Sequence, residues 1–172
     1  CDDGNVMTNN DIIQNDCSCA GTPLILTNDL IITAVFDGSL SGGTPKGIEI
    51  YVVNNIADLS VFGLASITNG QGSPGQEYPF PADAATAGDF IYITANDTEF
   101  DTFFGFGENY VTGVMGINGD DAIELYEQGV VIDVFGEIDN DGTGTAWEYT
   151  DGWAYRNCET GPEGSTFTEA NW

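Results

Sequence analysis

Positive charge is the scarcest feature of this 172-residue sequence, which has two Lys or Arg residues, no histidine and 28 Asp or Glu residues. The formal net charge is therefore −26. Nucleic-acid binding depends on clustered Lys and Arg that displace counterions from phosphates, so this composition excludes a nucleic-acid groove. The lack of histidine also excludes Ser-His-Asp and Cys-His catalysis and every His-ligated metal site.

Long apolar runs are absent as well, and none reaches the roughly 18 residues that a membrane-spanning helix needs. Hydrophobic residues still make up 41% of the chain, which predicts one folded domain with at most a short extension. Lys46 and Arg156 are the only strong cations. Most carboxylates must therefore face water, accept backbone N–H groups or bind metal ions, and Arg156 is expected to pair with a buried or half-buried carboxylate.

The chain has four cysteines and contains no C-x-x-C motif, so a zinc site is not expected. An even number of cysteines predicts two disulfides and an oxidising compartment. A ring between Cys17 and Cys19 would be strained, so we expect Cys158 to bond one of these two residues and Cys1 to bond the other.

The chain begins at Cys1, which is typical of a mature product whose leader has been removed. The segment Cys1-Asp2-Asp3-Gly4 also resembles the mature start of a bacterial surface lipoprotein, in which the first Cys carries a lipid anchor and acidic residues follow. Both interpretations predict an extracellular or bacterial cell-surface protein without membrane insertion beyond a lipid at Cys1.

Two regions differ in composition. Residues 1–22 are rich in Asp, Asn and Thr, contain one apolar pair, Ile12-Ile13, and are predicted to form an N-terminal arm. Residues 23–172 form the predicted domain, in which runs of β-branched and aromatic residues alternate with glycine-rich turns. Strands are expected at 30–36, 47–53, 61–67, 90–94, 122–126 and 130–135, and short helical turns at 82–87 and 99–104. This pattern predicts an all-β sandwich with an extended arm.

Several segments in a fixed order carry a family resemblance. They include residues 30–38, 43–51, 58–60, 63–64, 78–80, 88–91, 118–126, 131–136 and 144–156. This series resembles the bacterial lamin-tail domain, over about residues 24–172. The resemblance implies an immunoglobulin-like β-sandwich that binds or scaffolds on secreted and surface proteins and is not an enzyme.

The segment 137–148 has the ligand spacing of an EF-hand calcium loop. Oxygen-bearing side chains and the turn glycine fall at the expected positions in Glu137, Asp139, Asp141, Gly142, Thr143 and Glu148. The first position is normally Asp, and flanking helices are not expected in this fold. The sequence thus predicts calcium as a cofactor, with a polar β-turn as the alternative.

Other local signals have a structural and a functional interpretation. Asn96 begins the sequon Asn96-Asp97-Thr98 and is a candidate glycosylation site. The aromatic run Trp147, Tyr149, Trp153 and Tyr155 fits sugar stacking, but sandwich core with aromatic cover is the favoured interpretation. The segment 118–121 is expected to be a turn in which Asp accepts backbone N–H groups.

Two functional hypotheses follow. In the first, the protein is a structural or adhesive module that associates with copies of itself, because an arm with Ile12-Ile13 can add a strand to an open sheet edge; alternatively the arm folds back and bonds Cys158 through Cys17 or Cys19. In the second, it is a calcium-dependent binding module for polysaccharide or another surface ligand, or the accessory part of a secreted hydrolase.

Overall fold

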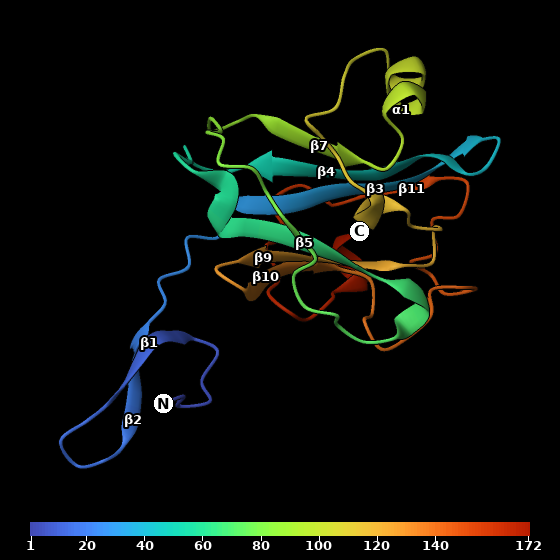
Figure 1. Cartoon of the computed structure of the whole chain (residues 1–172). Coiled ribbons are helices and arrows are strands. Elements are labelled where there is room, and N and C mark those ends of the chain that lie inside the picture. The colour runs from blue at the N-terminus through green and yellow to red at the C-terminus, as the bar shows by residue number, and fades with distance from the viewer.

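The computed structural model describes all 172 residues and confirms an all-β fold. Two sheets lie face to face in the body of the molecule, and a separate hairpin forms the N-terminal arm (Figure 1). The five-stranded sheet has the order β11 (Trp153–Tyr155), β3 (Leu30–Leu40), β4 (Thr44–Val52), β7 (Phe90–Thr94) and β8 (Tyr110–Val111). The four-stranded sheet has the order β10 (Val130–Phe135), β9 (Ala122–Glu127), β5 (Phe62–Ile67) and β6 (Tyr78–Pro79).

All neighbouring strands of the body are antiparallel except β7 and β8, which are parallel. The six expected strands correspond to β3, β4, β5, β7, β9 and β10. The predicted hairpin turn after Glu127 is confirmed, since Gln128 and Gly129 both have left-handed φ, 52° and 80°. Such a pair of residues forms the tight connection that matches the twist of the flanking strands.

Helical structure is limited to α1 (Asp97–Phe104) and four short 3-10 turns, η1 (Leu59–Val61), η2 (Thr68–Gly70), η3 (Gly113–Met115) and η4 (Glu169–Asn171). α1 confirms the predicted helical turn at 99–104. The prediction of a second one at 82–87 is wrong, because Ala85 pairs with Ile56 in an isolated β-bridge. None of the helices combines the length and apolar character required to cross a bilayer.

The core lies between the two sheets and follows the period of two that strands impose on their side chains. Leu30 and Ile32 of β3 belong to one buried cluster with Ile123 and Leu125 of β9. Trp147 and Tyr149 join this cluster, as predicted for the core part of the aromatic run. The outer aromatic residues Trp153 and Tyr155 are instead exposed.

Five carboxylates are buried in the body, and each has hydrogen-bond donors: Asp37, Asp121, Glu124, Glu127 and Asp133. Each of the two strong cations of the protein forms an ion pair with one of these carboxylates. Lys46 Nζ lies 2.9 Å from Asp37 Oδ1, and Arg156 Nη2 lies 2.9 Å from Asp133 Oδ1. The predicted buried pair at Arg156 is thereby confirmed.

Neutral donors satisfy the other buried carboxylates. Asp121 accepts the backbone N–H groups of Asn69 and Asn118, at 2.9 and 3.0 Å, which confirms the predicted capping turn. Burial raises the pKa of Asp121, and these two N–H groups oppose the shift. Two backbone N–H groups therefore stabilise this buried carboxylate.

Glu127 joins the arm to the body. Its carboxylate accepts the N–H groups of Thr27 and Asn28, at 2.9 and 3.0 Å, and the Thr27 hydroxyl at 3.1 Å. These two residues lie in the linker 24–29, between the arm and β3. A buried side chain at the end of β9 therefore fixes the point from which the arm leaves.

Replacing Glu127 with alanine is expected to release this linker. Two backbone N–H groups then lose their bonds to a charged acceptor, and a hydrogen bond to a charged group contributes about 1.5–3 kcal/mol. Amide hydrogen exchange at Thr27 and Asn28 should accelerate about tenfold or more. Glu137→Ala is the control, because Glu137 accepts only the Asn140 side chain; equal exchange in both variants would contradict the role assigned to Glu127.

Candidate functional site

The N-terminal arm is a two-stranded antiparallel hairpin that projects from the body (Figure 1). It consists of β1 (Thr8–Ile13) and β2 (Cys19–Pro23), with Ile13 opposite Cys19. The turn closes through the Gln14 N–H, which donates to the Ser18 carbonyl at 2.8 Å, and through the Ser18 N–H, which donates to Asp16 at 3.0 Å. The arm therefore has its own strand pairing, which the polar composition of residues 1–22 did not reveal.

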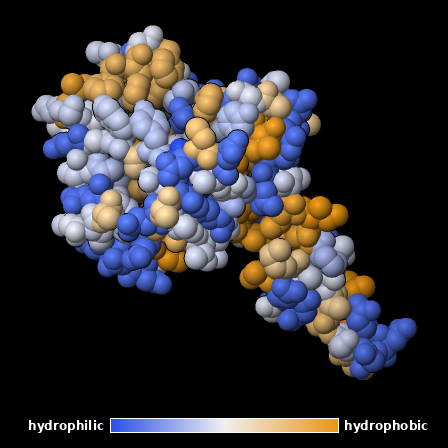
Figure 2. Space-filling view, turned by 180° about the vertical axis from the view of Figure 1, so that it is seen from behind, coloured by the Kyte–Doolittle hydropathy of each residue, from blue (hydrophilic) through white to orange (hydrophobic).

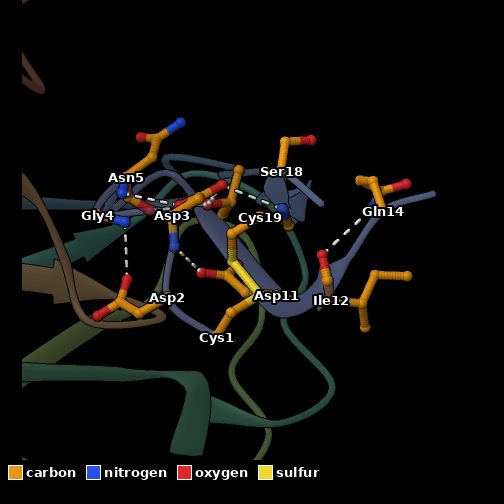
Figure 3. The surroundings of a disulfide bond; sticks show 12 residues. Cys1, Asp2, Asp3, Gly4, Asn5, Asp11, Ile12, Gln14, Ser18 and Cys19 are labelled. Carbon is orange, nitrogen blue, oxygen red and sulfur yellow. Dashed lines mark hydrogen bonds between the residues drawn. A yellow bond between two sulfur atoms is a disulfide. The ribbon is translucent and has the colours of Figure 1, made fainter. Parts of the chain in front are cut away.

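Carboxylates and a disulfide hold the start of the arm in place (Figure 3). Asp3 accepts the N–H groups of Asn5 and Gly21, at 2.9 and 3.0 Å, and Asp11 accepts the Asp3 N–H at 2.7 Å. The Asn5 N–H is the main reason that the pKa of Asp3 is lowered. Asp2, Asp3 and Asp11 bring carboxylate oxygens within 4.8 Å of one another. The carboxylates of Asp3 and Asp11 already accept hydrogen bonds within the arm.

The disulfide pairing agrees with the expected one in part. Cys1 bonds Cys19, one of the two partners expected for it, whereas Cys17 and Cys158 are free and exposed. The expectation that Cys158 bonds Cys17 or Cys19 is wrong, and so is the alternative in which that bond folds the arm back. The reason is that β1–β2 pairing brings Cys19 close to Cys1, while the arm projects away from the body. A lipid thioether at Cys1 would use the sulfur that this disulfide occupies.

Large apolar side chains of the arm face solvent. Ile12 and Ile13 are 62% and 70% exposed, and Val6 of the arm and Ile25 of the linker are 76% and 82% exposed. Figure 2 shows hydrophobic residues on the arm and at its junction with the body. A two-stranded hairpin has no second layer against which to bury such residues. The arm therefore presents apolar surface that the monomer leaves without a partner.

A groove of about 650 Å³ lies where the arm meets the body. Val6 and Met7 of the arm form one side, and Val130 and Val131 of β10 form part of the other. β10 is an edge strand of the four-stranded sheet. An apolar channel thus runs beside a strand edge at the base of the arm.

A second groove, of about 400 Å³, lies on the outer face of the five-stranded sheet. Its lining includes Ile31 of β3, Tyr51 of β4, Val53 and the free Cys158. Ile31 alternates with the core residues of β3, so it points away from the sandwich. Sequence reasoning missed this groove because nothing local marks which apolar residues of a strand face outward.

The predicted calcium loop lies on the body after β10, and local contacts occupy its carboxylates. Asp141 accepts the Thr143 N–H at 2.8 Å, and Glu148 accepts the Gly144 N–H at 2.7 Å. The Thr143 N–H is the first cause of the lowered pKa of Asp141. Glu137, Asp139, Asp141 and Glu148 do not form a group of three with oxygens within 4.8 Å. Calcium binding at this loop stays a prediction.

Asn96 lies directly before α1, where its side-chain oxygen accepts the Lys46 N–H at 3.1 Å. It is half-buried, whereas Asp97 and Thr98 of the sequon are exposed. Glycosylation at Asn96 also stays a prediction.

Comparisons with protein-family models, curated proteins and solved structures gave no match to this chain. The two-sheet β-architecture is therefore described from its own residues. The resemblance to lamin-tail domains remains a prediction.

Proposed function

We propose that this protein is a non-enzymatic structural module of the extracellular space or bacterial surface, with an immunoglobulin-like, lamin-tail-like body, and that it associates with copies of itself. The observation that carries the proposal is the projecting arm, on which Ile12 and Ile13 are 62% and 70% exposed. Burying a large aliphatic side chain stabilises a contact by about 1.5–3 kcal/mol. Contact with apolar surface on another molecule would therefore stabilise the exposed residues of the arm.

The body supplies surfaces for such a contact. One apolar groove lies beside the edge strand β10, and a second lies on the outer face of the five-stranded sheet, beside Cys158. An arm from another copy differs from the surface that receives it, so the contact is heterologous. Heterologous contacts continue from copy to copy and produce filaments or layers when they do not close into a ring.

Replacing Ile12 and Ile13 with aspartate is expected to abolish this association. Sedimentation velocity of the wild type should show large particles at high concentration, and the double variant should remain monomeric. The control is Leu40→Asp with Val61→Asp, which changes two exposed apolar residues of the body. A monomeric wild type at every concentration, or equal assembly of the arm variant, would refute the proposal.

Net charge opposes assembly. At −26, copies repel one another over a screening length of roughly 8–10 Å at ordinary salt. Lowering the ionic strength and adding EDTA should therefore shift the sedimentation profile toward monomers, and restoring salt or divalent ions should reverse the shift. Particles that keep their size at low salt in EDTA would contradict this expectation.

One observation favours a second candidate, a polysaccharide-binding module with calcium as cofactor, alone or as accessory to a secreted hydrolase. Trp153 and Tyr155 of β11 are 50% and 58% exposed. Residues two apart on a strand share a face, so the two rings offer one side of the sheet to a sugar. Binding on a glycan array that is lost in Trp153→Ala, together with a calcium-dependent rise in melting temperature, would support this candidate.

A further inference from the structure

The geometry points to a disulfide between Cys17 of one copy and Cys158 of the next copy, with the arm tip seated in the groove beside Cys158. The inference rests on the proposed self-association and names the covalent link that would secure it. Both thiols are exposed and unpaired, while the other two cysteines are joined to each other within the arm.

The two free thiols belong to different parts of the molecule. Cys17 lies in the turn at the tip of the arm, between β1 and β2, where its N–H donates to the Gln14 carbonyl at 3.0 Å. Cys158 lies on the body, just after β11. The hairpin holds the arm tip away from its own body (Figure 1). A bond between these thiols therefore joins two copies, and because each copy has one of each kind, it repeats along a chain.

Apolar surface surrounds both thiols. Ile12 and Ile13 immediately precede the turn that contains Cys17 and are exposed. The side chains of adjacent strand residues point to opposite faces. One of these two isoleucine side chains therefore contacts any surface on which the tip lies.

The groove beside Cys158 offers a matching surface. Tyr51 and Val53 line it together with Ile31, and the exposed Phe90 ring lies 5.3 Å from that of Tyr51. The outer face of a two-sheet fold is normally polar, so an apolar area here lacks a partner in the monomer. An arm tip from another copy would cover it and bring Cys17 to Cys158.

The bond forms by thiol–disulfide exchange with a small-molecule disulfide as oxidant. The Cys17 thiolate attacks the oxidant and releases one thiol, which leaves a mixed disulfide on Cys17. The Cys158 thiolate of the other copy then attacks the Cys17 sulfur and releases the second thiol. The two cysteines lose two protons and two electrons, and the oxidant is reduced to two thiols.

The full-length protein, incubated with oxidised and reduced glutathione, provides the test on a non-reducing denaturing gel. The wild type should form a ladder beyond dimers. Cys17→Ser and Cys158→Ser cannot form this bond, so each alone should give no ladder and far less dimer than an equimolar mixture of the two variants, in which one copy of each is joined. Peptide mass spectrometry should find Cys17 joined to Cys158. A ladder in either single variant, or the same bond within a monomer, would overturn the inference.

A second pair of variants tests the groove with both thiols in place. Val53→Asp should slow ladder formation about tenfold, because docking raises the effective concentration of the two thiols. Leu40→Asp, at a similarly exposed position outside the groove, should leave the rate unchanged. Equal rates in the two variants would overturn seating in this groove.

Sedimentation separates this inference from the proposed function. Wild type that assembles under oxidising conditions but forms no ladder would overturn the disulfide and leave self-association standing. Wild type that is monomeric under both oxidising and reducing conditions would overturn both.

Discussion

Arg156→Ala is expected to lower the free energy of unfolding by about 3–5 kcal/mol, because it leaves a buried carboxylate without its cation. For a domain of this size, such a loss lowers the melting temperature by roughly 10 °C. The guanidinium and the Asp133 carboxylate are 2% and 0% exposed, so water cannot replace the lost partner. Thermal unfolding followed by circular dichroism measures the effect.

Arg156 also connects β3, β10 and the C-terminal segment of the chain. Its Nε donates to the Ile32 carbonyl of β3 at 2.6 Å, and its Nη1 lies 2.9 Å from Glu163. Its guanidinium carbon lies 4.4 Å from the centre of the Trp172 ring. Arg156→Lys is the matched control, since it keeps the charge but not the planar group with several donors. The lysine variant should lose less stability than the alanine variant; equal losses would show that charge is not the main contribution.

The pH dependence of the alanine variant identifies Asp133 as the cause. Burial raises the pKa of Asp133, and Arg156 is the main opposing influence, so its removal raises that pKa further. Folded protein then holds the proton more tightly than the unfolded chain, and stability falls as pH rises from about 4 through the raised value. The difference between wild type and Arg156→Ala should therefore shrink as pH is lowered toward 4. A difference that is constant with pH would contradict this explanation.

Lys46→Met is expected to cost about 2–3 kcal/mol, the second largest loss, because it removes the cation beside Asp37. Methionine retains most of the apolar stem, so the loss reports the charge together with the hydrogen bond that Lys46 Nζ donates to the Ile117 carbonyl. The expected cost is smaller than at Arg156 because the lysine side chain is 14% exposed and Asp37 also accepts the Asp151 N–H at 3.3 Å. Adding Asp37→Asn to Lys46→Met should recover part of the stability in denaturant unfolding. A double variant less stable than the single one would show that Asp37 does not depend on Lys46.

The two cations illustrate how far sequence reasoning extends. With 28 carboxylates and two cations, pairing at Arg156 was predictable, but its partner was not. Asp133 and Glu163 were no more distinctive in sequence than other acids. Their selection depends on β10 and the segment after β11 meeting in space, which no local pattern encodes.

The strands that bury a face against the core followed from composition, since β-branched runs bounded by turns have few other stable arrangements. The arm did not. Asn, Asp and Thr gave residues 1–22 no strand signal, and the β1–β2 hairpin depends on a disulfide and on internal carboxylate contacts. The shorter strands β6, β8 and β11, of two or three residues, were also missed because their pairing depends on longer neighbours.

The sequence by itself determined the class of fold, the extreme acidity and the exclusion of histidine chemistry, because these depend on composition and local periodicity. The tertiary structure decided which carboxylates receive the two cations, which cysteines pair and which apolar residues face solvent. Those outcomes depend on the meeting of residues far apart in the chain. The two free thiols and the exposed arm became recognisable only when the fold had separated the arm tip from the body.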